Sequence, residues 1–123
     1  MARRFSIAER AGSFRHAFAG LLFMLRTQHN ARIHLGAAAT VAIAGFALGI
    51  TREDWRWLIA AIALVSMAEA VNTAFEHLCD VVSPDFHASV KLSKDIAAGA
   101  VLIAAIAAAI IGATVFWPYV LGR

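Results

Sequence analysis

Three long apolar stretches leave this chain few ways to fold. Residues 96–117 contain no charged side chain, and His34 is the only strongly polar residue in 33–50. A helix needs about 20 apolar residues to cross the hydrocarbon core of a bilayer. With 61% hydrophobic and only 15% charged residues, the composition lies far from that of soluble domains. We therefore expect an all-α integral membrane protein.

The residues between the apolar stretches set the boundaries of the expected elements. Residues 51–54 form a short polar turn, after which Trp55 and Trp57 open another span as interface anchors. Pro84 ends that span, because proline interrupts a helix. We predict one membrane domain over residues 1–123, with an amphipathic surface helix at 1–30, transmembrane helices at 31–50, 55–80 and 95–119, and a cytoplasmic loop at 81–94.

The N-terminal segment is basic and amphipathic. Phe14, Phe18, Leu21 and Leu25 recur at the spacing of one helix face, and arginines lie off that face. Such a helix lies in the membrane interface, where it either anchors the protein or contributes to ligand binding.

Positive charge predicts the orientation. The N-terminal arginines flank the same side of the predicted spans as Lys91 and Lys94. Segments on the cytoplasmic side carry an excess of Lys and Arg. We expect a cytoplasmic N-terminus, a location in the inner membrane, and a polar site that faces the compartment containing ATP.

A polar stripe interrupts the second span. At about 100° per residue, Glu69, Asn72, Glu76 and Asp80 return to nearly one azimuth of a helix. A charged side chain at the bilayer centre costs roughly 2.5–3.5 kcal/mol on insertion scales. Acids at such a depth therefore indicate an ion pathway, a proton relay, a metal site or catalysis.

The depth of each polar residue suggests its chemistry. Glu69 lies deepest, where a carboxylate suits a general base. Glu76 and Asn72 offer the hard oxygen ligands that Mg²⁺ prefers. Lys94 lies near the membrane surface, where an ammonium group neutralises phosphate oxygens.

Two other classes of protein fit the same residues. Glu76 or Asp80 paired with Lys94 or Arg32 would serve a structural scaffold, and intramembrane acids also occur in ion conductors. The sequence contains neither a P-loop nor the glycine-rich loop of protein kinases, so any nucleotide site is of another type. A chain with so few spans encloses little volume, and we expect an oligomer with sites shared between subunits.

Several sequence segments resemble the signature of the prokaryotic diacylglycerol kinase family, which includes diacylglycerol kinases and undecaprenol kinases. The central motif is EAVNTAFEHLCD at 69–80, followed by SPDFH at 83–87 and KLSKDIAAGAVL at 91–102. The resemblance extends to FRHAFAG at 14–20 and NARIH at 30–34, and so covers nearly the whole chain.

The resemblance implies a trimer that uses Mg-ATP to phosphorylate a membrane lipid alcohol. It implies that Glu69 is the general base, that Glu76 and residue 28 ligate the metal, and that Glu69 and Ala98 contact the lipid. The nucleotide-binding residues that it implies are His16, Asn72, Asp80, Asp85, Phe86, His87, Lys94 and Asp95.

Two positions depart from the pattern of the family. Gln28 stands where a second metal-ligating Glu is frequent, and an amide oxygen ligates Mg²⁺ without contributing formal charge. His16 replaces a frequent tyrosine. The 81–87 loop and the run 94–99 look closer to undecaprenol kinases, which favours a polyprenol as the lipid over diacylglycerol.

Overall fold

The computed structural model describes residues 4–122, so the first three residues of the predicted 1–30 helix lie outside the described part. Four helices account for nearly all of the described residues, which contain no strand. The helices are α1 (Ile7–Thr27), α2 (His29–Leu48), α3 (Arg52–Val82) and α4 (Ala88–Val120). Of the described helices, α2, α3 and α4 are long and apolar enough to cross a membrane. The prediction of an all-α protein with three potential spans is confirmed.

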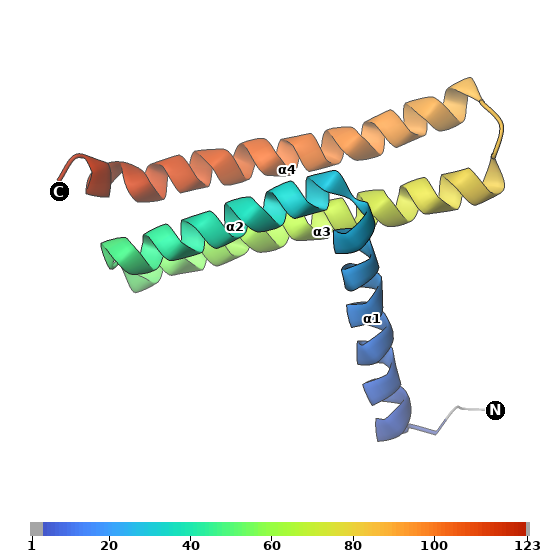
Figure 1. Ribbon diagram of the computed structural model, residues 1–123, viewed down its shortest axis with the longest axis horizontal. Coiled ribbons are helices and arrows are strands. Elements are labelled where there is room, and N and C mark those ends of the chain that lie inside the picture. Colours follow the sequence, from blue (N-terminus) through green and yellow to red (C-terminus); the bar gives the residue numbers. More distant parts are fainter. Residues whose placement is uncertain (1–3, 123) are drawn as a thin grey trace.

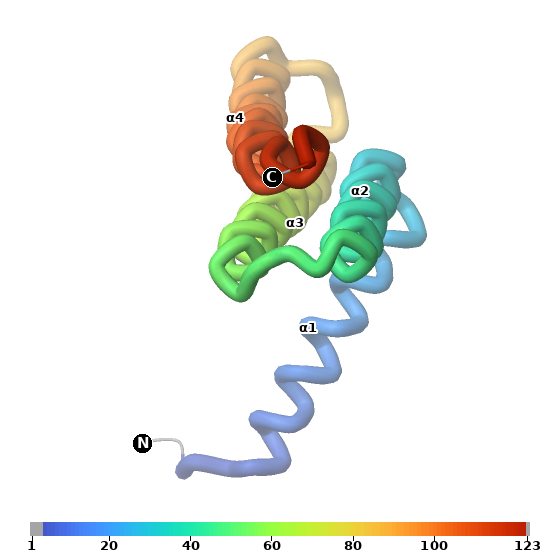
Figure 2. Tube along the Cα trace, turned by 90° about the vertical axis from the view of Figure 1, so that its left-hand side faces the viewer, coloured from blue at the N-terminus to red at the C-terminus, as the bar shows by residue number. Residues whose placement is uncertain are grey.

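Helices α2, α3 and α4 run antiparallel in succession, and α1 leaves them at a steep angle (Figure 1). In the view along the helices, α2 and α4 both lie beside α3 (Figure 2). The packing of α3 against α4 is the most extensive contact between helices. With α2 on one side and α4 on the other, α3 has 33% of its most apolar stretch buried, against 11% in α2 and 11% in α4. Most apolar side chains of α2 and α4 therefore remain available to lipid or to other copies of the chain.

Helix lengths separate two ends of the bundle. At about 1.5 Å per residue, the 20 residues of α2 span about 30 Å, which matches the hydrocarbon core of a bilayer. The 31 residues of α3 span about 46 Å. The C-terminal part of α3 and the start of α4 consequently extend past α2 (Figure 1). We call this the turn end, and the opposite end, where α4 finishes, the Tyr119 end.

The Tyr119 end is closed by a polar network over a small apolar core. The Tyr119 hydroxyl donates to Asp54 Oδ2 at 2.6 Å, and the Thr51 N–H donates to the same carboxylate at 3.1 Å. Thr51 and Asp54 also form a capping box that starts α3. Ile50, Leu58 and Val115 pack below the network.

A sharp corner joins α1 to α2. Gln28 is extended and interrupts the helix, and its N–H donates to Met24 O at 2.8 Å. The Arg32 guanidinium, on the first turns of α2, donates to the carbonyl of Leu25 at 2.8 Å and to that of Arg26. These bonds satisfy carbonyls at the end of α1 and fix its direction relative to α2.

The connection between the last two helices is shorter than the predicted 81–94 loop. It consists of residues 83–87, and α4 begins at Ala88. The His87 Nδ1 accepts a hydrogen bond from the Ser89 N–H at 3.2 Å and so caps the helix. Lys91, Lys94 and Asp95 are therefore helical residues. The predicted spans 55–80 and 95–119 likewise lie within the longer helices α3 and α4.

Candidate active site

The polar residues of α3 run from a buried position to an exposed one. Glu69 is 2% exposed and Asn72 7%, whereas Glu76 is half-buried and Asp80 is exposed. Thr73, next to Asn72, is also buried. The order of depth along this stripe agrees with the order that the sequence predicts.

Three buried oxygens on this part of α3 have no hydrogen-bond partner within residues 4–122. They are Glu69 Oε2, Asn72 Oδ1 and Thr73 Oγ1. The nearest ionisable partner of Glu69 is His34 on α2, whose Nε2 lies 3.8 Å from Glu69 Oε2. Because an unsatisfied buried polar group costs free energy, three of them within five residues indicate a place where a ligand or water binds.

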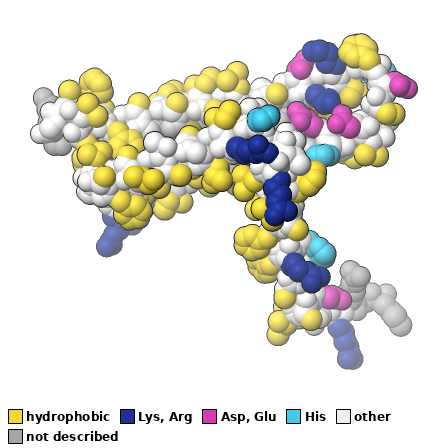
Figure 3. Space-filling model, viewed as in Figure 1, with side chains coloured by type: hydrophobic (Ala, Val, Ile, Leu, Met, Phe, Trp, Pro, Cys, Tyr) yellow, Lys and Arg dark blue, Asp and Glu magenta, His cyan; other side chains and the backbone are white. Residues whose placement is uncertain are grey.

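A hollow of about 440 Å³ lies between α3 and α4 at the turn end. Figure 3 shows acidic and basic side chains gathered over this end of the molecule. The hollow brings together eight of the residues that the family resemblance singles out: Glu76, Asp80, Asp85, Phe86, His87, Lys94, Asp95 and Ala98. Residues from the end of α3, the turn and the start of α4 thus form one surface.

Two ion pairs arrange the lysines of the hollow. Lys94 Nζ lies 2.8 Å from Asp80 Oδ1 and joins α4 to α3 across the hollow. Lys91 Nζ lies 2.6 Å from Asp95 Oδ2, one turn along the same helix. Each ammonium group has three donors, so both lysines retain hydrogen-bonding capacity for the oxygens of an anionic ligand.

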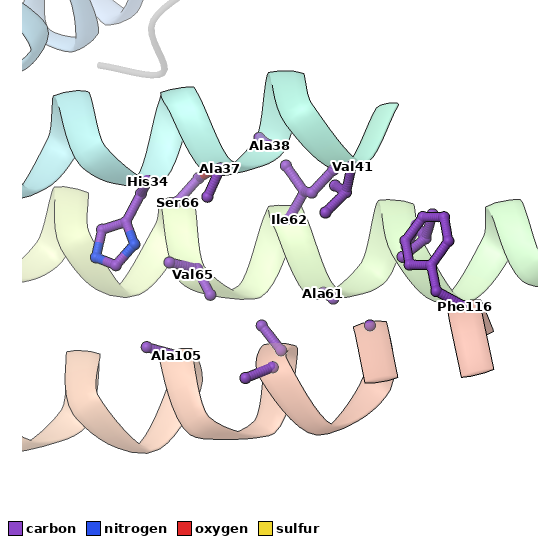
Figure 4. A pocket seen from close by; sticks show the side chains of 14 residues that line it. His34, Ala37, Ala38, Val41, Ala61, Ile62, Val65, Ser66, Ala105 and Phe116 are labelled. Carbon is purple, nitrogen blue, oxygen red and sulfur yellow. The ribbon is translucent and has the colours of Figure 1, made fainter. Parts of the chain in front are cut away.

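An apolar groove of about 380 Å³ runs between α2, α3 and α4. Alanines from all three helices line it, together with larger apolar side chains such as Ile62, Val65 and Phe116. Figure 4 shows the His34 side chain extending from α2 toward α3 at one end of the groove and Phe116 at the other. The groove therefore leads along the apolar helices to the imidazole that faces Glu69.

Besides the buried Glu69, three predicted site residues lie apart from the hollow. His16 is on α1, in a separate hollow with Arg10 and Glu9. Gln28 is half-buried at the corner between α1 and α2, and Asn72 is buried in α3. The described residues contain no group of three His, Cys, Asp or Glu side chains arranged to hold a metal ion.

The chain matches the family model described as prokaryotic diacylglycerol kinase over residues 15–116. It belongs to the prokaryotic diacylglycerol kinase family. An undecaprenol kinase from Bacillus subtilis is 37% identical over 106 residues, which are 86% of this chain and 86% of that protein. A diacylglycerol kinase from Synechocystis sp. is 40% identical over 107 residues, 86% of this chain and 61% of that protein.

Membership in the diacylglycerol kinase family confirms the resemblance found in the sequence and makes the chain a lipid kinase. With three helices long and apolar enough to span a bilayer among the described residues, it is a multi-pass membrane protein. The matched residues 15–116 include the whole of α3, which carries Glu69 and Glu76, and they also include the Asp80–Lys94 pair.

Sequence reasoning left three residues of this region without a role in the site. Thr73 is buried beside Asn72, and its position four residues after Glu69 on the same helix face was the available signal. Lys91 lines the hollow, and its spacing of four from Asp95 predicts their pairing. His34 was visible as the one strongly polar residue of its apolar stretch, but nothing local connects it to Glu69.

Proposed function

We propose that this chain transfers the γ-phosphoryl group of ATP to the hydroxyl of a membrane lipid alcohol, either undecaprenol or diacylglycerol. The observation that carries the proposal is the hollow at the turn end, which gathers carboxylates and lysines within a few turns of a buried acid. The products are ADP and the lipid phosphate.

The nucleotide binds in the hollow at the turn end. Lys94 and Lys91 neutralise phosphate oxygens, and the Asp80 carboxylate orients Lys94 through their 2.8 Å ion pair. Phe86 and His87 offer an aromatic surface to the base. Asn72 and Asp95 contribute polar groups, and His16 contacts the nucleotide from the surface helix of a neighbouring subunit.

The donor set of the site suits Mg²⁺. Glu76 supplies a carboxylate and Gln28 an amide oxygen, and both are hard ligands. Mg²⁺ typically binds one or two protein carboxylates and completes its coordination with phosphate oxygens and water, so a cluster of three acids is not required. When bound, the ion offsets negative charge on the phosphates.

The lipid lies with its chain in the apolar groove and its hydroxyl near Glu69. The buried Glu69 carboxylate takes the hydroxyl proton, and the alcohol oxygen then attacks the γ-phosphorus. The bond from that phosphorus to the bridging oxygen breaks as the new bond forms, and ADP leaves. Ala98, on the wall of the hollow, contacts the head of the lipid.

Helix length supports a site at the cytoplasmic surface of the inner membrane. Because α2 alone matches a bilayer core, the longer α3 and α4 carry the hollow beyond it, toward water. The lysines at the turn end favour the cytoplasmic side. The exposed apolar faces of α2 and α4, together with the distant His16, favour an oligomer with shared sites. The family resemblance implies that this oligomer is a homotrimer.

The test offers purified full-length protein in lipid nanodiscs γ-labelled ATP, Mg²⁺ and either undecaprenol or diacylglycerol. Transfer of label to one or both lipids is expected, with undecaprenol the better acceptor, since the turn resembles undecaprenol kinases. Nanodiscs without added alcohol give the background. Label in neither lipid would contradict the proposal, and a monomeric mass with full activity in native mass spectrometry would contradict the trimer.

A further inference from the structure

His34 occupies a position that apolar packing does not explain. The groove that it lines is otherwise apolar apart from Ser66. An imidazole placed among alanines and valines loses hydration, which is unfavourable unless a polar group compensates. In the described residues, the ionisable group within ion-pair distance of its Nε2 is the Glu69 carboxylate, at 3.8 Å.

Glu69 has a matching need for a partner. Its Oε2 is buried and makes no hydrogen bond within the part of the chain that the structure describes. Glu76, two turns further along α3, carries charge of the same sign and so does not compensate it. His34 approaches from another helix, α2, and can donate to Oε2 through an N–H on Nε2 after a small movement of either side chain.

The groove shows on which side of Glu69 the imidazole of His34 lies. His34 lines the groove, whereas Glu69 does not appear among its described lining residues. The imidazole therefore lies between the apolar path and the buried carboxylate. A general base must reach the proton that it removes at about 2.6–3.2 Å, and a misplacement of about 1 Å can cost 10²-fold in rate.

We propose that His34 is a positioning residue for Glu69. Its imidazole holds the carboxylate oxygen at the end of the apolar groove, where the hydroxyl of the lipid arrives. This role rests on the proposed function, in which Glu69 is the base. His34 itself neither takes the proton nor contacts the phosphate.

The test compares His34→Leu and His34→Gln with the wild type, in nanodiscs with Mg-ATP and whichever lipid alcohol the wild type phosphorylates. His34→Leu fits the apolar groove but removes the donor, so kcat falls on the order of 10²-fold while the KM values for ATP and lipid stay near those of the wild type. The amide of His34→Gln restores a donor, so kcat returns to within about tenfold of the wild type.

Thr40→Leu serves as the matched control, since Thr40 is exposed on the same helix and bonds only the Gly36 carbonyl at 2.8 Å. It should leave kcat unchanged. Elution on size exclusion and Mg-ATP binding report folding of each variant. If His34→Leu does not fold, His34→Ala with added imidazole replaces it, and partial recovery of kcat is expected.

Three results would overturn the positioning role. They are a wild-type kcat in His34→Leu, a loss that lies wholly in the KM for lipid, and an absence of recovery in both His34→Gln and the imidazole experiment. A wild-type chain that phosphorylates neither lipid would instead overturn the proposed function, and the role of His34 with it.

Discussion

The two ends of the α3–α4 pair treat buried and half-buried polar groups in opposite ways. At the Tyr119 end, Asp54 receives bonds from Tyr119 and Thr51, at 2.6 and 3.1 Å. Toward the turn end, Glu69 Oε2 and Asn72 Oδ1 have no hydrogen-bond partner among the described residues. At the Tyr119 end, Asp54 is therefore satisfied within the chain. Glu69 and Asn72 are left for a ligand or water to complete their hydrogen bonding.

This difference in hydrogen bonding indicates that one part of the α3–α4 pair serves stability and another part serves function. A satisfied network stabilises the relative position of α3 and α4, because breaking it leaves polar groups unpaired. Unsatisfied groups are a cost that the fold carries where a ligand completes the bonding. Substitutions at the turn end should therefore change rates, and substitutions at the Tyr119 end should change stability.

The largest effect is expected for Glu69→Gln. The amide keeps the shape of the side chain but cannot accept the hydroxyl proton, so kcat should fall by about 10²–10⁴-fold. Binding of Mg-ATP, measured by calorimetry, should remain largely intact. Glu53→Gln, an exposed acid at the Tyr119 end, is the control and should have full activity. Lost ATP binding in Glu69→Gln would move Glu69 into the nucleotide site.

Lys94→Met should have the next largest effect. Its ammonium group pairs with Asp80 in the hollow. In the proposed function it offsets charge on the transferred group. Removing one such donor should lower kcat on the order of 10²–10³-fold. Arg56→Met, which removes an exposed cation paired with Glu53 at the other end, should leave steady-state kinetics unchanged. If Lys94→Met raises only the KM for ATP, Lys94 binds the ground state alone.

The sequence predicts the stripe better than the helix that faces it. Periodicity places Glu69, Glu76 and Asp80 on one face, and their order along one continuous helix gives their order of depth. Lys91 and Lys94 fall in the predicted 81–94 loop, since hydropathy detects the bilayer core and not a helix that continues past it. The local signal for the true start of α4 is His87, whose side chain caps the helix that begins at the next residue.

The features that the sequence does not predict are contacts between residues that lie far apart in the chain. The bond between Tyr119 and Asp54 joins positions 65 residues apart, and the approach of His34 to Glu69 joins two different helices. Neither leaves a periodic pattern, because each depends on the register between helices and not on the sequence of one. The motifs at 69–80 and 91–102 indicate the family without giving these registers.

Substitutions of Gln28 should change the Mg²⁺ concentration needed for half-maximal rate more than they change the maximal rate. Gln28→Ala removes an oxygen ligand and should raise the Mg²⁺ concentration for half-maximal rate several-fold, whereas Gln28→Glu adds formal charge and should lower it. Asn30→Ala removes an exposed amide two residues away and is the control. An unchanged Mg²⁺ dependence in Gln28→Ala would show that Gln28 is not a ligand.

Tyr119→Phe should have the smallest effect on catalysis and tests the comparison from the other end. Loss of the hydroxyl removes the 2.6 Å bond to Asp54, so the apparent melting temperature in detergent should fall by a few degrees. The kcat per folded molecule should stay within about twofold, because the hollow lies at the far end of the helices and Glu69 is several helical turns from Asp54. Trp117→Phe, at a mostly exposed side chain, should change neither quantity. A large loss of kcat in Tyr119→Phe at unchanged melting temperature would mean that the Tyr119 end sets the register between Asp80 and Lys94, and that stability and function are not separated along this pair.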